Sequence, residues 1–325
     1  MPTASAVPAT DVPPRSAEPQ LGENAHKHPK RTFTRPSAFH FPLHPFALQM
    51  TAPPPNPPAK QPNPFYLDVL RREIANGGLR TTDRVLVTCG GNLDRVTLLA
   101  AGFTDVVITN LAPHAGHQDY SPFPWEHQDI ENLSYADGSF DLTVVHSGLH
   151  HCYNPARAMG ELCRVARRTV IAFEPYETWL TRLGAKLGYG QQYEDQAVHG
   201  FGGLSGGVAN TEIPNHVYRF RESEIRKFAR TFYPFGEPPL RFYRALRVNV
   251  ERFKLHRNPL LRISFSLALP VLQLLSRLIP SFNNNLCFVI QNPGPEHFHE
   301  WIRETDGTPR VDPEYLQRKY GKFPS

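Results

Sequence analysis

The sequence has few cysteines, and none of them is placed as a metal ligand or a redox pair would be. The four cysteines, Cys89, Cys152, Cys163 and Cys287, form no Cys-x-x-Cys pair. We therefore expect free thiols in a reducing compartment, with neither disulfides nor a thiolate metal site. The fifteen histidines are scattered along the chain, so no metal site is expected from them either.

The chain also lacks long basic runs and an apolar leader. Its net charge is +5, and the stretch from Lys27 to Arg35 is its one basic run of useful length. This pattern argues against a nucleic-acid-binding protein. No apolar stretch opens the sequence, so we expect no secretory signal and a cytoplasmic protein.

The most apolar segment, residues 260–280, is too short to cross a membrane. Arg262 and Arg277 enclose only 14 uncharged residues, whereas a spanning helix needs about 20. Pro270 interrupts the segment. We expect a helix packed in the protein core, with peripheral contact to a membrane surface as the alternative.

Proline is concentrated at the N-terminus. Of the 33 prolines, 16 lie at or before Pro64, and the same residues show almost no periodic apolar pattern. Such a segment cannot bury enough apolar surface to offset its chain entropy. The sequence therefore predicts a disordered Pro-rich arm over residues 1–63, followed by one domain over residues 64–325.

The stretch from Asp83 to Leu111 organises this domain. An apolar run at 85–87 leads into Gly90-Gly91, then apolar positions recur at helical spacing, and a second apolar run follows at 106–108. This order predicts a strand, a tight turn, a helix and a parallel strand. The glycines let a ligand approach the backbone at the start of the helix, although a plain tight connection explains them equally well.

The same alternation of strands and helices continues downstream. We expect a helix from Asn154-Pro155 that ends at Arg167-Arg168, because the two cations suit the negative pole of a helix. Further strands are predicted at residues 142–145, 169–173, 241–250 and 286–290. The fold class is therefore α/β, a Rossmann-like three-layer αβα sandwich around a mostly parallel sheet.

Several motifs together resemble a known family. The stretches VLVTCGGN, VITNL, HQDIENLSYADGSFDLTVVHSGLHH and HCYNPARAMGELCRVARRTVIAFEP occur in this order. They resemble class I S-adenosylmethionine-dependent methyltransferases of the small-molecule type. The resemblance implies a seven-stranded sheet with an antiparallel last strand and S-adenosylmethionine as the cofactor.

The resemblance also implies which residues would hold that cofactor. They follow the carboxyl ends of the first four strands, where open α/β sheets bind ligands. Asp129 would meet the adenine amino group while Ile130 packs on the ring, although Asp129 capping a turn is the alternative. The candidate cofactor-binding residues are Thr88, Cys89, Gly90, Gly91, Asn92, Asp94, Asn110, Leu111, Asp129, Ile130 and His146.

Two features depart from the family pattern. Val87, Cys89 and Leu93 stand where the pattern has an acid and two glycines, and Asn110 replaces the acid that binds the ribose hydroxyls. These departures favour, as the alternative, a catalytically silent methyltransferase-like interaction module. A nicotinamide-dependent oxidoreductase comes third, because an acid or a basic residue is expected at Asn110 in such enzymes.

The acceptor is expected to be a hydroxyl on a small molecule or a sugar. His150, His151 and Glu174 follow the fourth and fifth strands, where a general base would stand. Residues 176–234 are too long for a simple connection and are expected to form a lid or an acceptor-binding insertion. Within the insertion, Asn215, Tyr218 and Arg219 are the candidate substrate-binding residues, and a surface loop packed on the sheet edge is the alternative.

Overall fold

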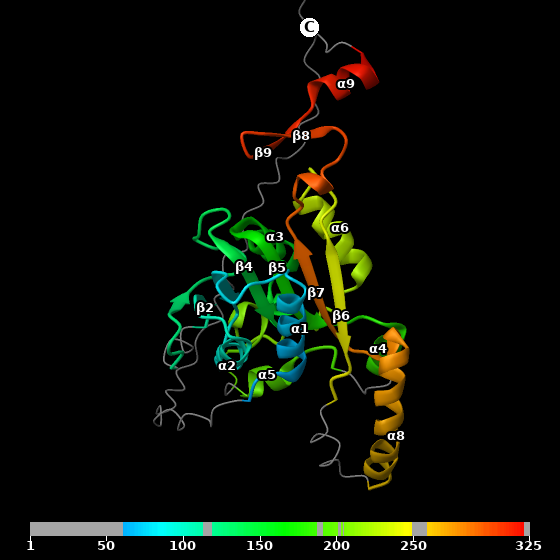
Figure 1. Ribbon diagram of the computed structural model, residues 1–325. Helices are drawn as coiled ribbons and strands as arrows, with labels where there is room; N and C mark the ends of the chain where they lie inside the picture. Colours follow the sequence, from blue (N-terminus) through cyan, green and yellow to red (C-terminus); the bar gives the residue numbers. More distant parts are fainter. Residues whose placement is uncertain are drawn as a thin grey trace, which may run out of the picture. The chain divides into compact units, whose positions relative to one another are not determined.

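The structure is a computed structural model, shown in Figure 1. The residues that it describes are 61–112, 119–186, 191–200, 203, 205–248 and 259–321. The predicted disordered arm therefore lies outside the described residues except for its last three. Of these, Asn63 is the N-cap of the first helix, where its side chain accepts hydrogen bonds from the backbone N–H groups of Phe65 and Tyr66.

A seven-stranded sheet forms the centre of the described chain (Figure 1). Its strands are β1 (Val85–Thr88), β2 (Val106–Asn110), β3 (Trp125–His127), β4 (Phe140–His146), β5 (Ala166–Pro175), β6 (Leu240–Ala245) and β7 (Asn285–Gln291). They lie in the order β3-β2-β1-β4-β5-β7-β6. All neighbours are parallel except β7, which runs antiparallel to both β5 and β6. The predicted mostly parallel sheet with an antiparallel last strand is confirmed.

The predicted strand–turn–helix–strand unit is present at residues 85–110. Every residue of β1 is buried, as a strand covered on both faces must be. The helix α2 (Asn92–Ala101) ends at Gly102, whose φ of 91° is the left-handed conformation that suits a glycine at a helix end. β1 then pairs in parallel with β2 on one side and with β4 on the other.

Helices cover both faces of the sheet and make the predicted three layers. One apolar cluster joins the sheet to α1 (Pro64–Ala75) and α2, through residues such as Leu70, Leu98 and Val87. A second cluster joins the other face to α3 (Pro155–Val165) and α6 (Glu222–Phe232). Alternate residues of each strand supply the two clusters, because successive side chains of a strand point to opposite faces.

A buried carboxylate, Glu73, links α1 to β6, the strand at one edge of the sheet. Glu73 is fully buried, and its Oε1 accepts hydrogen bonds from Arg241 Nε at 2.8 Å and from the Tyr243 hydroxyl at 2.5 Å. Both partners belong to β6. A buried charge is tolerated only when it is paired and hydrogen-bonded, so this network fixes where α1 lies.

The predicted end of the third helix is wrong. α3 ends at Val165, and Arg167 and Arg168 belong to β5. Arg168 Nη1 lies 2.8 Å from Asp83 Oδ1, and Arg167 pairs with Asp141. The ion pairs with Asp141 on β4 and with Asp83 before β1 stabilise the two arginines in β5 more than the weak attraction of a cation to a helix end would stabilise them in α3.

The predicted end of the sixth strand also moves. The sixth strand ends at Ala245 instead of running to residue 250, and residues 249–250 lie outside the described residues. The insertion 176–234 contains short helices before α6.

The remaining elements are η2 (Leu149–His151), α4 (Trp179–Lys186), α5 (Asp195–Gly200), η3 (Val208–Asn210), α8 (Pro259–Leu278), η4 (Pro280–Phe282), η5 (Pro295–His297), β8 (Ile302–Thr305), β9 (Thr308–Val311) and α9 (Pro313–Tyr320).

The expectation that α8 packs in the core is wrong. A stripe of exposed apolar side chains follows the helix at helical spacing: Ile263, Leu267, Val271, Leu274 and Leu278. Leu267 keeps 73% of its surface exposed. Among the helices that the structure describes, none is long and apolar enough to cross a membrane. The alternative, contact with a membrane surface, stays a prediction.

We expect α8 to bind anionic phospholipid vesicles through this apolar stripe. Burial of the apolar stripe in the membrane interface would favour binding. The helix contains two arginines and no acidic residue, so its charge favours an anionic surface. Leu267→Glu should weaken co-sedimentation with phosphatidylglycerol vesicles at least about tenfold. Gln273→Glu adds the same charge outside the stripe and should weaken it less. Equal losses in both variants, or no binding of the native chain, would contradict the prediction.

Candidate active site

The candidate site lies where the strand order reverses. The chain leaves β1 through α2 to β2 on one side and later returns to β4 on the other side of β1. In open α/β sheets, the crevice outside the carboxyl ends of two such strands is the usual ligand site. The loops after β1 and β4 touch there, since a Cβ atom at Gly148 would lie 2.6 Å from Cβ of Cys89.

The turn after β1 is tightly packed on one side and open on the other. A Cβ atom at Gly90 would lie 2.8 Å from the side chains of Val87 and Ile108, so only glycine fits. A Cβ atom at Gly91 would meet nothing within 4 Å. The Gly91 N–H donates to the Asp94 carboxylate at 2.8 Å, so Asp94 caps α2. The glycine turn thus leaves open space at the start of the helix, as an approaching ligand requires.

Cys89, in the same turn, is held in a left-handed conformation with φ of 52°. Burial, together with the nearby charges of Glu174, Asp94 and Asp129, raises the pKa of its thiol to about 12. The side chain therefore stays protonated at neutral pH and acts as a packing group between the two loops.

The candidates after β2 hold the turn in place. Asn110 Nδ2 donates to the carbonyl oxygen of Gly90 at 2.9 Å, and Asn110 Oδ1 accepts from the Ala112 N–H at 2.9 Å. Thr88 is buried and donates to the carbonyl oxygen of Val144. The carbonyl oxygen of Leu111 bonds to the His127 ring. Within the described residues, the Asn110 amide is thus occupied by the chain itself.

Asp129 and Asn92, by contrast, keep part of their side chains available. Asp129 is exposed, and Oδ1 accepts from the Glu131 N–H at 2.9 Å. Ile130 is buried in the second apolar cluster. Asn92 is half-buried, and its side-chain oxygen accepts from Arg95. The turn-capping role of Asp129 is present, and its side chain is exposed.

The end of β4 is covered by α1. The His146 ring stacks on Tyr66, with 5.4 Å between the ring centroids and 6° between the planes. Burial lowers the pKa of His146 to about 4; the charge of Glu174 opposes this shift, and those of Arg247 and His150 add to it. The ring is therefore neutral at physiological pH.

Glu174, at the end of β5, is the most constrained candidate. It is fully buried. Its Oε1 accepts from the backbone N–H groups of Gly148 at 3.0 Å and Leu149 at 2.7 Å, and its Oε2 lies 2.5 Å from His150 Nδ1. Three donors converge on one buried carboxylate, so Glu174 positions the loop after β4 and the ring of His150.

A second carboxylate, Glu194, meets the two histidines from the other side. His150 Nε2 lies 3.4 Å from Glu194 Oε2, and His151 Nε2 lies 3.1 Å from the same oxygen. Burial by itself lowers the pKa of His150, but the charges of and hydrogen bonds to Glu174 and Glu194 raise it to about 10. Although burial alone would raise the pKa of Glu194, the two histidines hold it well below its usual range.

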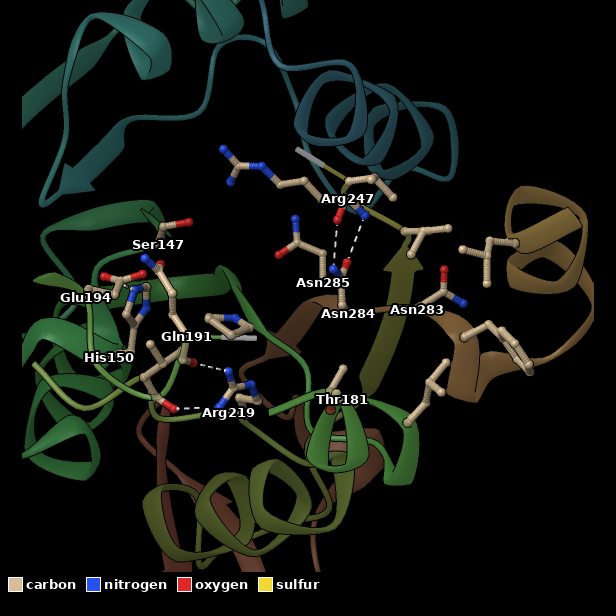
Figure 2. A pocket seen from close by; sticks show the side chains of 18 of the residues that line it. Ser147, His150, Thr181, Gln191, Glu194, Arg219, Arg247, Asn283, Asn284 and Asn285 are labelled. Atoms are coloured by element: carbon tan, nitrogen blue, oxygen red, sulfur yellow. Dashed lines mark hydrogen bonds and ion pairs between the residues drawn. The ribbon is translucent and has the colours of Figure 1, made fainter. Parts of the chain in front are cut away.

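A cavity of about 590 Å³ lies beside this cluster (Figure 2). The loops after β4, β5 and β6, the insertion and the segment before β7 supply its walls. The polar residues that line it are Ser147, His150, His151, Thr181, Gln191, Glu194, Arg219, Arg247, Asn283, Asn284 and Asn285. Leu180, Leu246, Leu272 and Phe282 supply apolar surface.

Of the three predicted substrate-binding residues, only Arg219 lines this cavity. Its guanidinium group donates to the carbonyl oxygen of Gln191 at 2.5 Å (Figure 2). Asn215 is buried beside the cluster and donates to the carbonyl oxygen of His150 at 3.1 Å. Tyr218 packs on Phe220, and its hydroxyl donates to Glu224. Tyr218 therefore supports the insertion and does not face the cavity.

Several lining residues were not predicted from the sequence. Glu194 stands in a stretch without an apolar pattern, Arg247 was placed inside the predicted sixth strand, and Asn283–Asn285 were given no role. The reciprocal bonds between Arg247 and Asn284 join the ends of β6 and β7. A run of three asparagines at the start of β7 is the signal in the sequence that could have pointed to this wall.

A comparison with protein families matches this part of the chain. Residues 87–173, which span β1 to β5, match the family model described as a methyltransferase domain. This part of the chain, about a quarter of its length, is therefore similar to a methyltransferase domain. The match spans the glycine turn, Asp129 and the cluster at His150, but it ends before the insertion and the far wall of the cavity. No curated protein matches the sequence.

Solved methyltransferase structures resemble the chain at low sequence identity. Magnesium protoporphyrin IX methyltransferase from Synechocystis, solved with bound SAH, is 14% identical; the match covers 70% of this chain and 81% of that one, with a TM-score of 0.42. A SAM-dependent methyltransferase from Methanosarcina mazei is 15% identical, with 67% and 96% covered and a TM-score of 0.40.

The methyltransferase family implies S-adenosylmethionine as the cofactor, and the residues at the strand ends fit it. Gly91 leaves open space at the start of α2, and Asp129 is an exposed carboxylate beside an apolar side chain. The buried hydroxyls of Tyr66 and Tyr120 have no hydrogen-bond partner among the described residues. A polar ligand group would satisfy such atoms, whose burial without a partner is costly. Asn110 uses one N–H group of its amide to hold Gly90, and its ribose-binding role stays a prediction.

We expect acid to destabilise the domain through His146. Its pKa is about 4 in the folded chain against 6.5 for the ordinary side chain. The stability that the neutral ring contributes is complete above pH 6.5 and is lost as the pH falls toward 4. Between these pH values the native chain should lose on the order of 3 kcal/mol more unfolding free energy than His146→Phe, measured by urea titration. Equal losses in the two proteins would contradict this.

We also expect Glu174→Gln to destabilise the domain by on the order of 2–3 kcal/mol, because a charged acceptor of three hydrogen bonds becomes neutral in a buried place. Glu212→Gln is the matched control: Glu212 is exposed, so the same change there should stay within about 0.5 kcal/mol. Urea unfolding of both variants tests the difference. A loss below about 1 kcal/mol for Glu174→Gln would show that its contacts are not a structural anchor.

Proposed function

We propose that this protein transfers the methyl group of S-adenosylmethionine to a hydroxyl group of a small polar molecule or sugar that carries an anionic group. One observation carries the proposal. The loop after β4 touches the glycine turn through Gly148 and lines the 590 Å³ cavity through Ser147 and His150. A crevice that suits the cofactor and a cavity that suits an acceptor thus share one loop.

The cofactor would be held at the carboxyl ends of β1 to β4. Gly91 would let it approach the backbone, Asp129 would accept a hydrogen bond from its amino group, and Ile130 would pack against its ring. When bound, the cofactor supplies an electrophilic methyl group on a positively charged sulfur. The neutral His146 ring, stacked on Tyr66, closes the same end of the sheet under α1.

The walls of the cavity favour an acceptor with an anionic part and an apolar part. Two cationic residues, Arg219 and Arg247, line it together with Asn283–Asn285. Guanidinium groups bind carboxylates and phosphates with two parallel hydrogen bonds. The leucines and Phe282 on the remaining wall give apolar contact to the acceptor's carbon skeleton.

The His150–His151–Glu194 cluster is where the acceptor hydroxyl would bind, and His151 is the member that would take its proton, because the raised pKa of His150 leaves that ring already protonated. All three residues line the cavity, and general acid–base catalysis needs such groups within hydrogen-bond reach of the reacting oxygen. Glu174 accepts three hydrogen bonds from the chain. It is therefore a positioning residue that acts through His150.

We expect S-adenosylhomocysteine to bind the full chain with a dissociation constant of roughly micromolar size in calorimetric titration. Asp129→Ala should weaken binding at least about tenfold, because a hydrogen bond to a charged acceptor is lost. Asp119→Ala is the matched control, since Asp119 is also exposed and accepts a hydrogen bond from the nearby Ser121 N–H. Unchanged affinity in Asp129→Ala would contradict the assigned cofactor site.

The acceptor class is tested by methyl transfer. The full chain is incubated with labelled S-adenosylmethionine and pairs of hydroxylated compounds that differ only in a carboxylate or phosphate group. We expect the charged member of each pair to be methylated on oxygen, and Arg219→Met to raise its KM at least about tenfold. Transfer only to amines, or equally to both members of each pair, would contradict the proposed acceptor class.

A catalytically silent module is the second candidate function. It is favoured by the Cys89 side chain, which lies against Gly148 between the two loops, and by the Asn110 amide, which is occupied by Gly90. A folded chain that binds no S-adenosylhomocysteine, alone or together with the acceptor panel, would establish this alternative.

A further inference from the structure

A group of three potential metal ligands lies on the wall of the cavity. His150, His151 and Glu194 each offer one ligand atom, and these three atoms lie within 4.8 Å of one another. The histidines belong to η2, directly after β4, and Glu194 comes from the insertion. Residues 44 positions apart in the sequence are thus brought together around one point in space.

The spacing of these atoms matches the spacing in a metal site. Zinc–ligand bonds of about 2.0–2.1 Å in tetrahedral geometry place neighbouring ligand atoms roughly 3.3–3.4 Å apart. Glu194 Oε2 lies 3.4 Å from His150 Nε2 and 3.1 Å from His151 Nε2. Two of the three separations are therefore close to the required length, and all three ligand atoms lie within 4.8 Å of one another.

The ring of His150 is oriented as a metal-binding histidine is. Its Nδ1 atom lies 2.5 Å from Glu174 Oε2, which directs Nε2 toward Glu194. A carboxylate that accepts from the second ring nitrogen is the usual support of a histidine ligand. Glu174 is itself fixed by the N–H groups of Gly148 and Leu149, so the first ligand is held before any ion arrives.

An unsatisfied polar atom lies beside the cluster. Asn215 is 3% exposed, and its Nδ2 atom donates to the carbonyl oxygen of His150 and lies 3.5 Å from Glu194 Oε2. Its Oδ1 atom is buried and has no hydrogen-bond partner among the described residues. A metal-bound water would donate a hydrogen bond to this Oδ1 atom. The ion pairs of the cluster alone supply no such donor.

We propose that His150, His151 and Glu194 bind one divalent transition-metal ion. Two imidazoles and one carboxylate are the protein ligands of catalytic zinc sites that keep a further position for water or substrate. Nitrogen and oxygen ligands without sulfur suit zinc, cobalt and nickel better than magnesium or calcium. Because all three residues line the cavity, the open position faces the space assigned to the acceptor.

The ion gives the cavity a chemical role. An ion held by these three residues would supply Lewis-acid chemistry: it would lower the pKa of an acceptor hydroxyl bound at the open position, and the proton would pass to solvent in the cavity. This consequence rests on the proposed methyl transfer. Binding of the ion does not rest on it, because the ligands, their spacing and their support are independent of the cofactor crevice.

The site is tested with cobalt(II) added to the full chain after dialysis against a chelator. We expect one equivalent of cobalt to give the intense visible d–d absorption of a tetrahedral site, without the sulfur-to-cobalt charge-transfer band that Cys89 or Cys152 would cause. Zinc should displace the cobalt. Octahedral aqueous cobalt absorbs far more weakly, so a spectrum that does not change on adding the protein overturns the proposal.

Variants show whether the ion sits on these three residues. His151→Gln and Glu194→Gln should each abolish the tetrahedral spectrum, and Glu174→Gln should weaken cobalt binding by about 10–100-fold through the loss of the support of His150. His199→Gln and Glu212→Gln are the matched controls at exposed positions of the insertion, and they should bind cobalt like the native chain.

The N-terminal sequence contains further histidines, which the double variant His151→Gln/Glu194→Gln separates from the site. If its cobalt spectrum and stoichiometry equal those of the native chain, the ion lies elsewhere and the proposal is overturned. Titration of S-adenosylhomocysteine into the same samples is a separate readout. If cobalt binds tetrahedrally but S-adenosylhomocysteine does not bind, the metal site is supported and the methyltransferase proposal is contradicted. If S-adenosylhomocysteine binds but no tetrahedral cobalt spectrum appears, the methyltransferase proposal is supported and the metal site is contradicted.

Discussion

The buried carboxylate of Glu174 fixes the geometry on which the candidate site depends. It accepts from two backbone N–H groups of the loop after β4 and holds the ring of His150. A fully buried carboxylate is stable only when its oxygens are satisfied in this way. Since the same loop carries Ser147, Gly148, His150 and His151, one interaction sets both its backbone path and the direction of its side chains.

Two regions of different character meet at this loop. On the side of β1, Gly148 packs against Cys89, and the glycine turn with Asp129 forms a crevice that suits the cofactor. On the side of β5, His150 and Glu194 join the loop to the insertion and to a cavity with two arginines and three asparagines. The order of the sheet places both regions at the carboxyl ends of parallel strands, and the buried Glu73 network fixes α1 over the first of them.

The sequence predicted the layers and most strands because apolar runs and glycine turns are local signals. Its failures have physical reasons. Arg167 and Arg168 looked like a helix end, yet ion pairs with Asp141 and Asp83 draw them into β5. The apolar residues of α8 predicted burial, but one stripe stays exposed. Glu194 reaches the two histidines only through the folding of the insertion, and no local pattern marks it. The roles assigned to Asp129 and to the acceptor residues stay predictions.

The most direct measurement is a crystal structure of the full chain grown with S-adenosylhomocysteine. The account predicts ligand density beside Gly91 and Asp129, outside the carboxyl ends of β1 to β4, with the Glu174 carboxylate still bound to the loop after β4. Density confined to the cavity lined by Arg219 and Arg247, or a crevice closed by Cys89 with no ligand in it, would contradict the account.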